Sequence, residues 1–171
     1  MILDDVSKLK AFTVSIDDNH VVEIRLNRPE AINSMNIDFW NELPAILDAL
    51  DSKAVARVII LSSKGKHFTA GMDLEVLSNM GGNPDDEPAR RAEQTRRWIL
   101  SLQNTFTQLE AARMPIISAI QGACIGGGVD MVCATDMRFC TANAYFNIKE
   151  TELGITADMG TLQRIQHVMP S

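Results

Sequence analysis

The sequence has no excess of basic residues, because 16 Lys and Arg stand against 22 Asp and Glu, for a net charge of −6. Phosphate backbones bind to basic faces, so nucleic acid is excluded as the main partner. No apolar run approaches the length of a membrane span. The first residues, MILDDVSK, lack a basic region and an Arg- and Ser-rich amphipathic stretch, so no targeting signal is visible.

Cysteine is scarce. The chain has Cys124, Cys133 and Cys140, an odd number with no CxxC spacing. This pattern favours reduced, buried, structural thiols over a disulfide framework, and no metal site is expected.

Two common nucleotide-binding motifs are also missing. The glycine-rich stretch 122–128 does not match GxGxxG and is not followed by an acid at the dinucleotide spacing. No Gly-Lys-Ser/Thr is present, so the chain has no P-loop.

The first half of the chain shows clear periodicities. Residues 12–16 and 22–26 alternate apolar and polar side chains around the turn formers 17–19, which predicts a β-hairpin. Residues 36–52 place apolar side chains three or four apart, which predicts an amphipathic helix that Pro44 begins or kinks.

Further along, residues 56–63 and 115–122 read as buried parallel strands, and residues 95–112 as a long helix. A polar stretch at 81–88 predicts an inserted surface loop. The alternation of helix and strand predicts an α/β fold with βαβ crossovers in a single domain, residues 1–171. The chain ends just after the start of a predicted helix, so the domain is expected to be incomplete at its C-terminus.

Two glycine turns each follow a predicted strand: HFTAGMDL at 67–74 and GACIGGGVD at 122–130. Open α/β sheets place ligands at the carboxyl ends of their strands. Two backbone N–H groups converging there on one carbonyl oxygen would form an oxyanion hole. The alternatives are a plain turn for AGMD and tight helix–strand packing for GGG.

Four acids in the second half of the chain are considered as candidate site residues: Asp130, Glu150, Glu152 and Asp158. Asp130 is expected in the first turn of a helix, where a carboxylate is favourable with or without a function. Asp158 precedes a Gly-Thr helix start, so it is a candidate for an N-cap or for a pocket acid. Glu150 and Glu152 would share one face of a strand, with at most one of them facing a pocket.

Together, HFTAGMDL, PIISAIQGACIGGGVDMVCATDMRFCT, FNIKETELGITADMGTLQRI and IRLNRPEAINSMN resemble the crotonase, or enoyl-CoA hydratase/isomerase, superfamily. The nearest resemblance is to its Δ3,5-Δ2,4-dienoyl-CoA isomerases, which carry acids matching Asp130, Glu150 and Asp158. Hydratases of the family have Glu, Glu and Gly there. The resemblance implies a spiral of ββα units whose C-terminal helical region is missing from this chain.

The resemblance also implies the parts of a site. Met72 and Gly127 would supply the oxyanion-hole N–H groups. A coenzyme A thioester substrate would be met by four residues of the two turns: Ala70, Gly71, Asp73 and Gly126. No cofactor is implied beyond the coenzyme A of the substrate. A homotrimer or hexamer in the peroxisome or mitochondrion is implied for the full-length protein.

Diene isomerisation needs a proton removed at C2 and another delivered at C6, which suits two separated carboxylates. We expect Glu150 at C2 and Asp158 at C6, with Asp130 as a third charge that tunes or orients them. Three acids in a partly apolar pocket should raise at least one pKa. Two alternatives stay open: a hydratase in which Asp130 and Glu150 hold one water, and a non-catalytic binder of coenzyme A thioesters.

Overall fold

The computed structural model describes residues 6–78, 83 and 85–169. After a short 3-10 turn, η2 (Val6–Lys8), the predicted hairpin forms from β1 (Phe12–Ile16) and β2 (Val21–Leu26). These strands pair antiparallel, and the Asp17 carboxylate accepts backbone N–H groups inside the turn. The hairpin prediction is therefore confirmed.

A second 3-10 turn, η3 (Pro29–Ala31), leads into α1 (Ile37–Lys53). The Asn36 side chain caps α1 by accepting the Phe39 N–H at 3.0 Å. The helix starts before Pro44, which lies inside it, so the expectation that this proline begins the helix is wrong. The cap at Asn36 determines the start instead.

The main sheet has five strands in the order β1-β2-β3-β4-β6. The added members are β3 (Val58–Ser63), β4 (Ile116–Ile120) and β6 (Met137–Cys140), and each pairs parallel to its neighbour. A second sheet pairs β5 (Ala123–Ile125) with β7 (Tyr145–Asn147). The successive pairs β4-β5 and β6-β7 thus each place one strand in each sheet, as expected for the ββα units of the predicted spiral.

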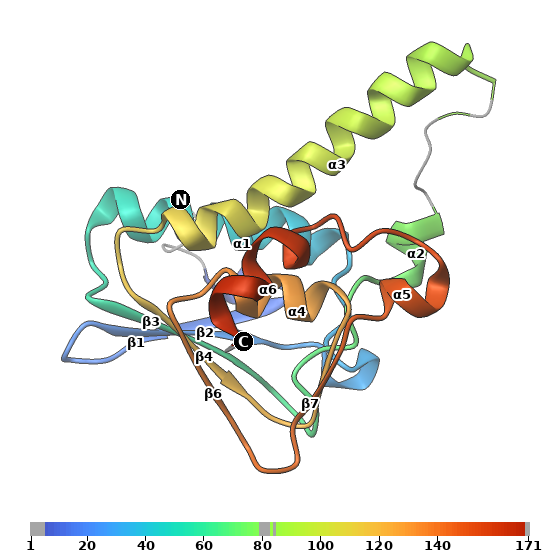
Figure 1. The fold of residues 1–171 in the computed structure, drawn as a ribbon. Coiled ribbons are helices and arrows are strands. Elements are labelled where there is room, and N and C mark those ends of the chain that lie inside the picture. The colour runs from blue at the N-terminus through green and yellow to red at the C-terminus, as the bar shows by residue number, and fades with distance from the viewer. Residues whose placement is uncertain (1–5, 79–82, 84, 170–171) are drawn as a thin grey trace.

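Helices connect and cover the sheets (Figure 1). After β3 come α2 (Leu74–Ser78) and α3 (Pro88–Ala111), and α4 (Gly127–Cys133) follows β5. The last two helices, α5 (Glu150–Leu153) and α6 (Thr161–Val168), follow β7, and α6 packs on α4. The predicted loop 81–88 includes residues 81, 82 and 84, which lie outside the described residues.

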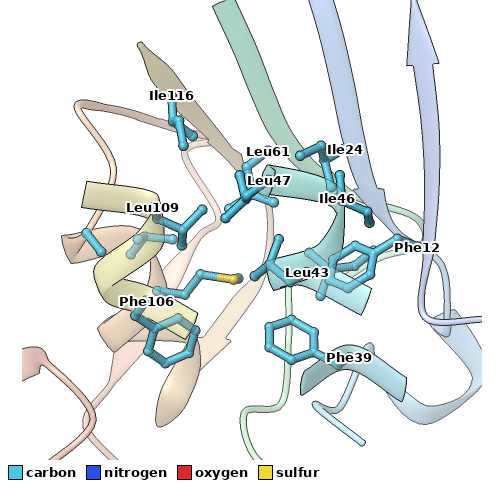
Figure 2. Close-up of a cluster of buried hydrophobic side chains, with 14 of the residues drawn as sticks. Phe12, Ile24, Phe39, Leu43, Ile46, Leu47, Leu61, Phe106, Leu109 and Ile116 are labelled. Carbon is cyan, nitrogen blue, oxygen red and sulfur yellow. The ribbon is translucent and has the colours of Figure 1, made fainter. Parts of the chain in front are cut away.

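The core lies between the main sheet and the helices α1 and α3 (Figure 2). Phe12 and Ile24 from the sheet face Leu43 of α1, and Phe106 of α3 closes the cluster from the other side. All four side chains are fully buried. Each such side chain stabilises the fold by roughly 1.5–3 kcal/mol relative to exposure, so the core holds the strand ends that carry the glycine turns.

The three cysteines are free, as predicted. Cys124 and Cys133 are buried, and burial raises the pKa of the Cys124 thiol to about 12. Cys140, however, is exposed, so the prediction of a buried thiol is wrong there. The reason is its place on β6, the outer strand of the main sheet, where most side chains are exposed.

Candidate active site

The two glycine turns lie side by side, joined by backbone hydrogen bonds. Thr69 and Cys124 form a parallel bridge. The N–H groups of Phe68 and Thr69 both donate to the Ala123 carbonyl at 3.0 Å, and the Ile125 N–H donates to the Thr69 carbonyl at 3.1 Å. The turns after β3 and β4 are thus parts of one site.

Glycine is required in these turns because other atoms come so close. Gly71 has a φ of +85°, and a Cβ on it would lie 2.6 Å from the Ile125 carbonyl oxygen. A Cβ on Gly128 would lie 2.4 Å from the Thr69 Cγ2. At both positions it is therefore the other glycine turn that leaves no space, since Thr69 belongs to the first turn and Ile125 to the second.

In the described part of the chain, the backbone N–H groups of Met72 and Gly127 donate to no acceptor. Met35 donates to the Gly71 carbonyl at 2.8 Å and accepts from the Asp73 N–H at 3.3 Å. This parallel bridge leaves the N–H of the intervening Met72 directed away from Met35. Gly127 begins α4, where N–H groups have no intrahelical acceptor. Among the described residues no backbone acceptor is found for either group, and a Cβ on Gly127 would lie 4.0 Å from the Met72 nitrogen.

Both turns open onto a pocket of about 520 Å³. Its walls come from the two turns, from α2, from one face of α3 and from the segment 149–159. Most of the lining is apolar, and its large apolar side chains are Met72, Leu74, Leu77, Trp98, Ile99, Ile125, Leu153, Ile155 and Met159. Such a pocket suits an acyl chain better than a charged ligand.

Glu150 lines this pocket, but it lies in the helix α5 and not in a strand. The strand prediction for 150–152 is therefore wrong, since β7 already ends at Asn147. Glu152 is exposed and pairs with Lys149, so only one of the two acids faces the pocket, as expected. The Glu150 Oε2 is buried without a hydrogen-bond partner in the described part of the chain.

Asp158 lines the same pocket on the segment before α6. It does not cap that helix, because the N-cap position belongs to Gly160 and no side-chain cap is formed there. The N-cap alternative for Asp158 is therefore wrong, and its carboxylate is exposed.

Asp130 is the acid that holds the start of α6. It lies in the first turn of α4, as predicted, with 0% of its surface exposed. Its Oδ1 accepts the Thr161 N–H at 2.6 Å, and its Oδ2 is without a partner among the described residues. Burial, with smaller contributions from the charges of Glu150 and Asp158, raises the pKa of Asp130 to about 6 despite this hydrogen bond. One acid thus has the predicted raised pKa.

This raised pKa makes stability depend on pH in a defined direction. The pKa of Asp130 rises from its ordinary value of 3.8 to about 6 in the folded chain. The protonated carboxyl of Asp130 contributes folding stability that is fully present below pH ~4 and is lost as the pH rises through ~6. Asp130→Asn removes this loss, so the free energy of unfolding of the variant minus that of the wild type should grow by about 2–3 kcal/mol from pH 4 to 7. Urea unfolding at several pH values measures this, and parallel curves for the two proteins would contradict it.

Asp73 lines the pocket too, but its carboxylate is already engaged. Its Oδ2 accepts from the Ser34 hydroxyl at 2.7 Å and from Arg28 at 3.3 Å, and its Oδ1 accepts the Glu75 N–H at the start of α2. The Ser34 hydrogen bond, with the Glu75 N–H and Arg28, holds the pKa of Asp73 below its ordinary value. Asp73 therefore stabilises the first glycine turn through these hydrogen bonds.

Of the site residues predicted from the sequence, the pocket is lined by Ala70, Met72, Asp73, Gly126, Gly127, Glu150 and Asp158. Gly71 and Asp130 do not line it, so the expectation of three acids in one pocket is wrong for Asp130, which is buried beneath α6. Sequence reasoning missed Ser34, Trp98 and Ile99 as lining residues. Trp98 was recognisable only as an apolar position of a helix. In the described ranges no cluster of three or more His, Cys, Asp or Glu could hold a metal ion, and no helix there is long and apolar enough to cross a membrane.

The sequence matches the enoyl-CoA hydratase/isomerase family over residues 17–171, and the chain belongs to this family. It is 45% identical over 154 residues to the peroxisomal Delta(3,5)-Delta(2,4)-dienoyl-CoA isomerase of Arabidopsis thaliana, covering 89% of this chain and 55% of the relative. The mitochondrial enzyme of that name from Rattus norvegicus is 42% identical, covering 94% of this chain and 49% of the relative. The chain thus spans about half the length of these relatives.

Solved structures agree on the crotonase fold. An enoyl-CoA hydratase from Shewanella pealeana superposes with a TM-score of 0.83 at 20% identity, covering 95% of this chain and 58% of that one. An enoyl-CoA hydratase from Bacillus anthracis superposes with a TM-score of 0.79 at 32% identity, covering 92% and 58%. The predicted family and fold are therefore confirmed.

Proposed function

We propose that this chain carries the catalytic centre of a Δ3,5-Δ2,4-dienoyl-CoA isomerase acting in fatty-acid β-oxidation. The observation that carries the proposal is one apolar pocket that Met72, Gly127, Glu150 on α5 and Asp158 before α6 all line. The N–H groups of Met72 and Gly127 have no acceptor among the described residues. The names of the relatives in Arabidopsis and rat support the same reaction.

In the proposed reaction the two N–H groups bind the thioester oxygen. Glu150 takes a proton from C2, and the C2–H electron pair forms a dienolate whose charge on oxygen the N–H groups stabilise. As the enolate collapses, double bonds form at C2–C3 and C4–C5, and C6 takes a proton from Asp158. One proton leaves C2 and one arrives at C6, so the product is an isomer and no cofactor is consumed. Glu150 starts ionised and Asp158 protonated, and the cycle closes when Glu150 releases its proton to solvent and the exposed Asp158 takes one up.

Enoyl-CoA hydration is the second candidate, because the similar Bacillus anthracis structure is named a hydratase. In that reaction Asp130 and Glu150 would hold one water between them. Two features disfavour it: the Asp130 side chain has no exposed surface, and one of its oxygens accepts the Thr161 N–H. Hydration also has no use for Asp158.

The test is the ultraviolet change when the protein meets a 3,5-dienoyl-CoA, with Asp158→Asn beside the wild type. The product diene is conjugated with the thioester, so conversion is directly visible. We expect the wild type to convert the substrate and Asp158→Asn to lose about 10²-fold in kcat, since its amide delivers no proton. Hydration of a 2-enoyl-CoA without diene conversion would favour the second candidate. If the folded protein converts neither substrate, a chain that only binds coenzyme A thioesters would be favoured.

The whole protein is proposed to be a homotrimer or hexamer, and to reside in the peroxisome or mitochondrion that the names of the relatives indicate. Its proposed small-molecule partner is the acyl-CoA thioester itself, without a further cofactor.

A further inference from the structure

The backbone around Asp158 is held from two helices that are distant in sequence. On one side, the side-chain amide of Gln103 on α3 donates to the Asp158 carbonyl oxygen at 2.7 Å. On the other side, Asp130 of α4 accepts the Thr161 N–H at 2.6 Å. These two hydrogen bonds lie three residues apart on the segment that carries the pocket acid.

The residues between α5 and Asp158 make few buried contacts. α5 ends at Leu153, followed by Gly154 in the left-handed region with a φ of +69°. From Glu152 to Thr156 every residue is exposed, and only Ala157 and Met159 beside Asp158 are buried. In the described chain the Asp158 carboxylate has no hydrogen-bond or ion-pair partner of its own. Its place in the pocket therefore depends on its main chain.

Resting on the proposed function, we infer that Gln103 is a positioning residue, which aims the Asp158 carboxylate at the remote end of the diene by holding the Asp158 backbone carbonyl. A carbonyl oxygen only accepts, so the hydrogen bond needs the NH₂ group of the Gln103 amide. Gln103 is half-buried on α3, next to the buried Leu102 that fixes this helix to the core.

The helix α6 has a separate attachment, so loss of the Gln103 bond need not release it. Arg164, largely buried, pairs with Glu110 on α3 at 2.7 Å. Glu150 lies on α5, before the exposed stretch, and its position does not depend on the Gln103 hydrogen bond. The proposal therefore separates the two proton transfers: removal at C2 is independent of Gln103, and delivery at C6 depends on it.

The kinetic test uses Gln103→Leu, which keeps the size of the side chain and removes the donor. Deuterium uptake at C2 of a recovered 3,5-dienoyl-CoA in D₂O reports the first transfer, and diene conversion reports the second. We expect Gln103→Leu to lower conversion about 10- to 100-fold, because small displacements of a catalytic group have effects of this size. Uptake at C2 should stay within about twofold of the wild type. Gln94→Leu is the matched control. Gln94 lies on α3 too, but its amide donates to Asp86, which does not line the pocket, so both rates should be unchanged.

Hydrogen–deuterium exchange of the isolated protein tests the contact without turnover. Gln103→Leu should speed exchange of the backbone amides of 158–161 and leave those of α4 protected. Unchanged exchange there, or an equal loss of C2 uptake and conversion, would overturn the inference. If the wild type converts no diene, the proposed function fails and the catalytic part of this inference falls with it, while the exchange data still decide whether Gln103 holds the segment.

Discussion

Replacing Glu150 by Gln is expected to lower kcat for diene conversion by about 10³-fold, within the range of a lost general base. The amide is nearly the same size, so the fold and the pocket should be kept, but it takes no proton from C2. Because this is the first transfer, deuterium uptake at C2 should be lost together with conversion. The ultraviolet assay and mass spectrometry of the recovered substrate measure the two rates.

Glu152→Gln is the matched control for this variant. Glu152 lies two residues away in the same short helix, is exposed, and pairs with Lys149 and Asn147. Its replacement should leave both rates within about twofold. A Glu150→Gln protein that keeps more than a tenth of the wild-type rate would exclude Glu150 as the base. The search would then move to Asp158, because the carboxylate of Asp73, the third pocket acid, is already hydrogen-bonded.

Replacing Gly71 by Ala is expected to lower the free energy of unfolding by about 2–4 kcal/mol, measured by urea titration. A Cβ there would lie 2.6 Å from the Ile125 carbonyl oxygen and 3.4 Å from the Gly127 nitrogen, both backbone atoms that cannot rotate away. Overpacking of this kind costs about 1–3 kcal/mol, and the left-handed backbone adds about 1 kcal/mol. The two turns would be pushed apart, so activity should fall as well.

Gly154→Ala separates the two contributions. Gly154 also has a positive φ, of +69°, but a Cβ there would have no atom within 4 Å. It should lose only the conformational part, about 1 kcal/mol. Equal losses in the two variants would mean that the close approach of the turns contributes nothing to stability.

These experiments address a site that local sequence patterns described only in part. Period and turn chemistry located the hairpin, α1, the buried strands and both glycine turns, because each of those signals acts over a few residues. The same local reasoning assigned Glu150 to a strand, although the chain turns into α5 there. It also expected Cys140 to be buried, because nothing local in the sequence shows that β6 is an outer strand.

The sequence by itself determined the family, the α/β spiral, the two turns and the acids Asp130, Glu150 and Asp158. Only the tertiary structure decided what each acid contacts. Asp130 meets Thr161 from 31 residues away, and Gln103 meets Asp158 from 55 residues away. Local preferences are properties of neighbouring residues and can be read along the chain, whereas hydrogen bonds between distant segments and the burial that shifts a pKa exist only once the helices have packed.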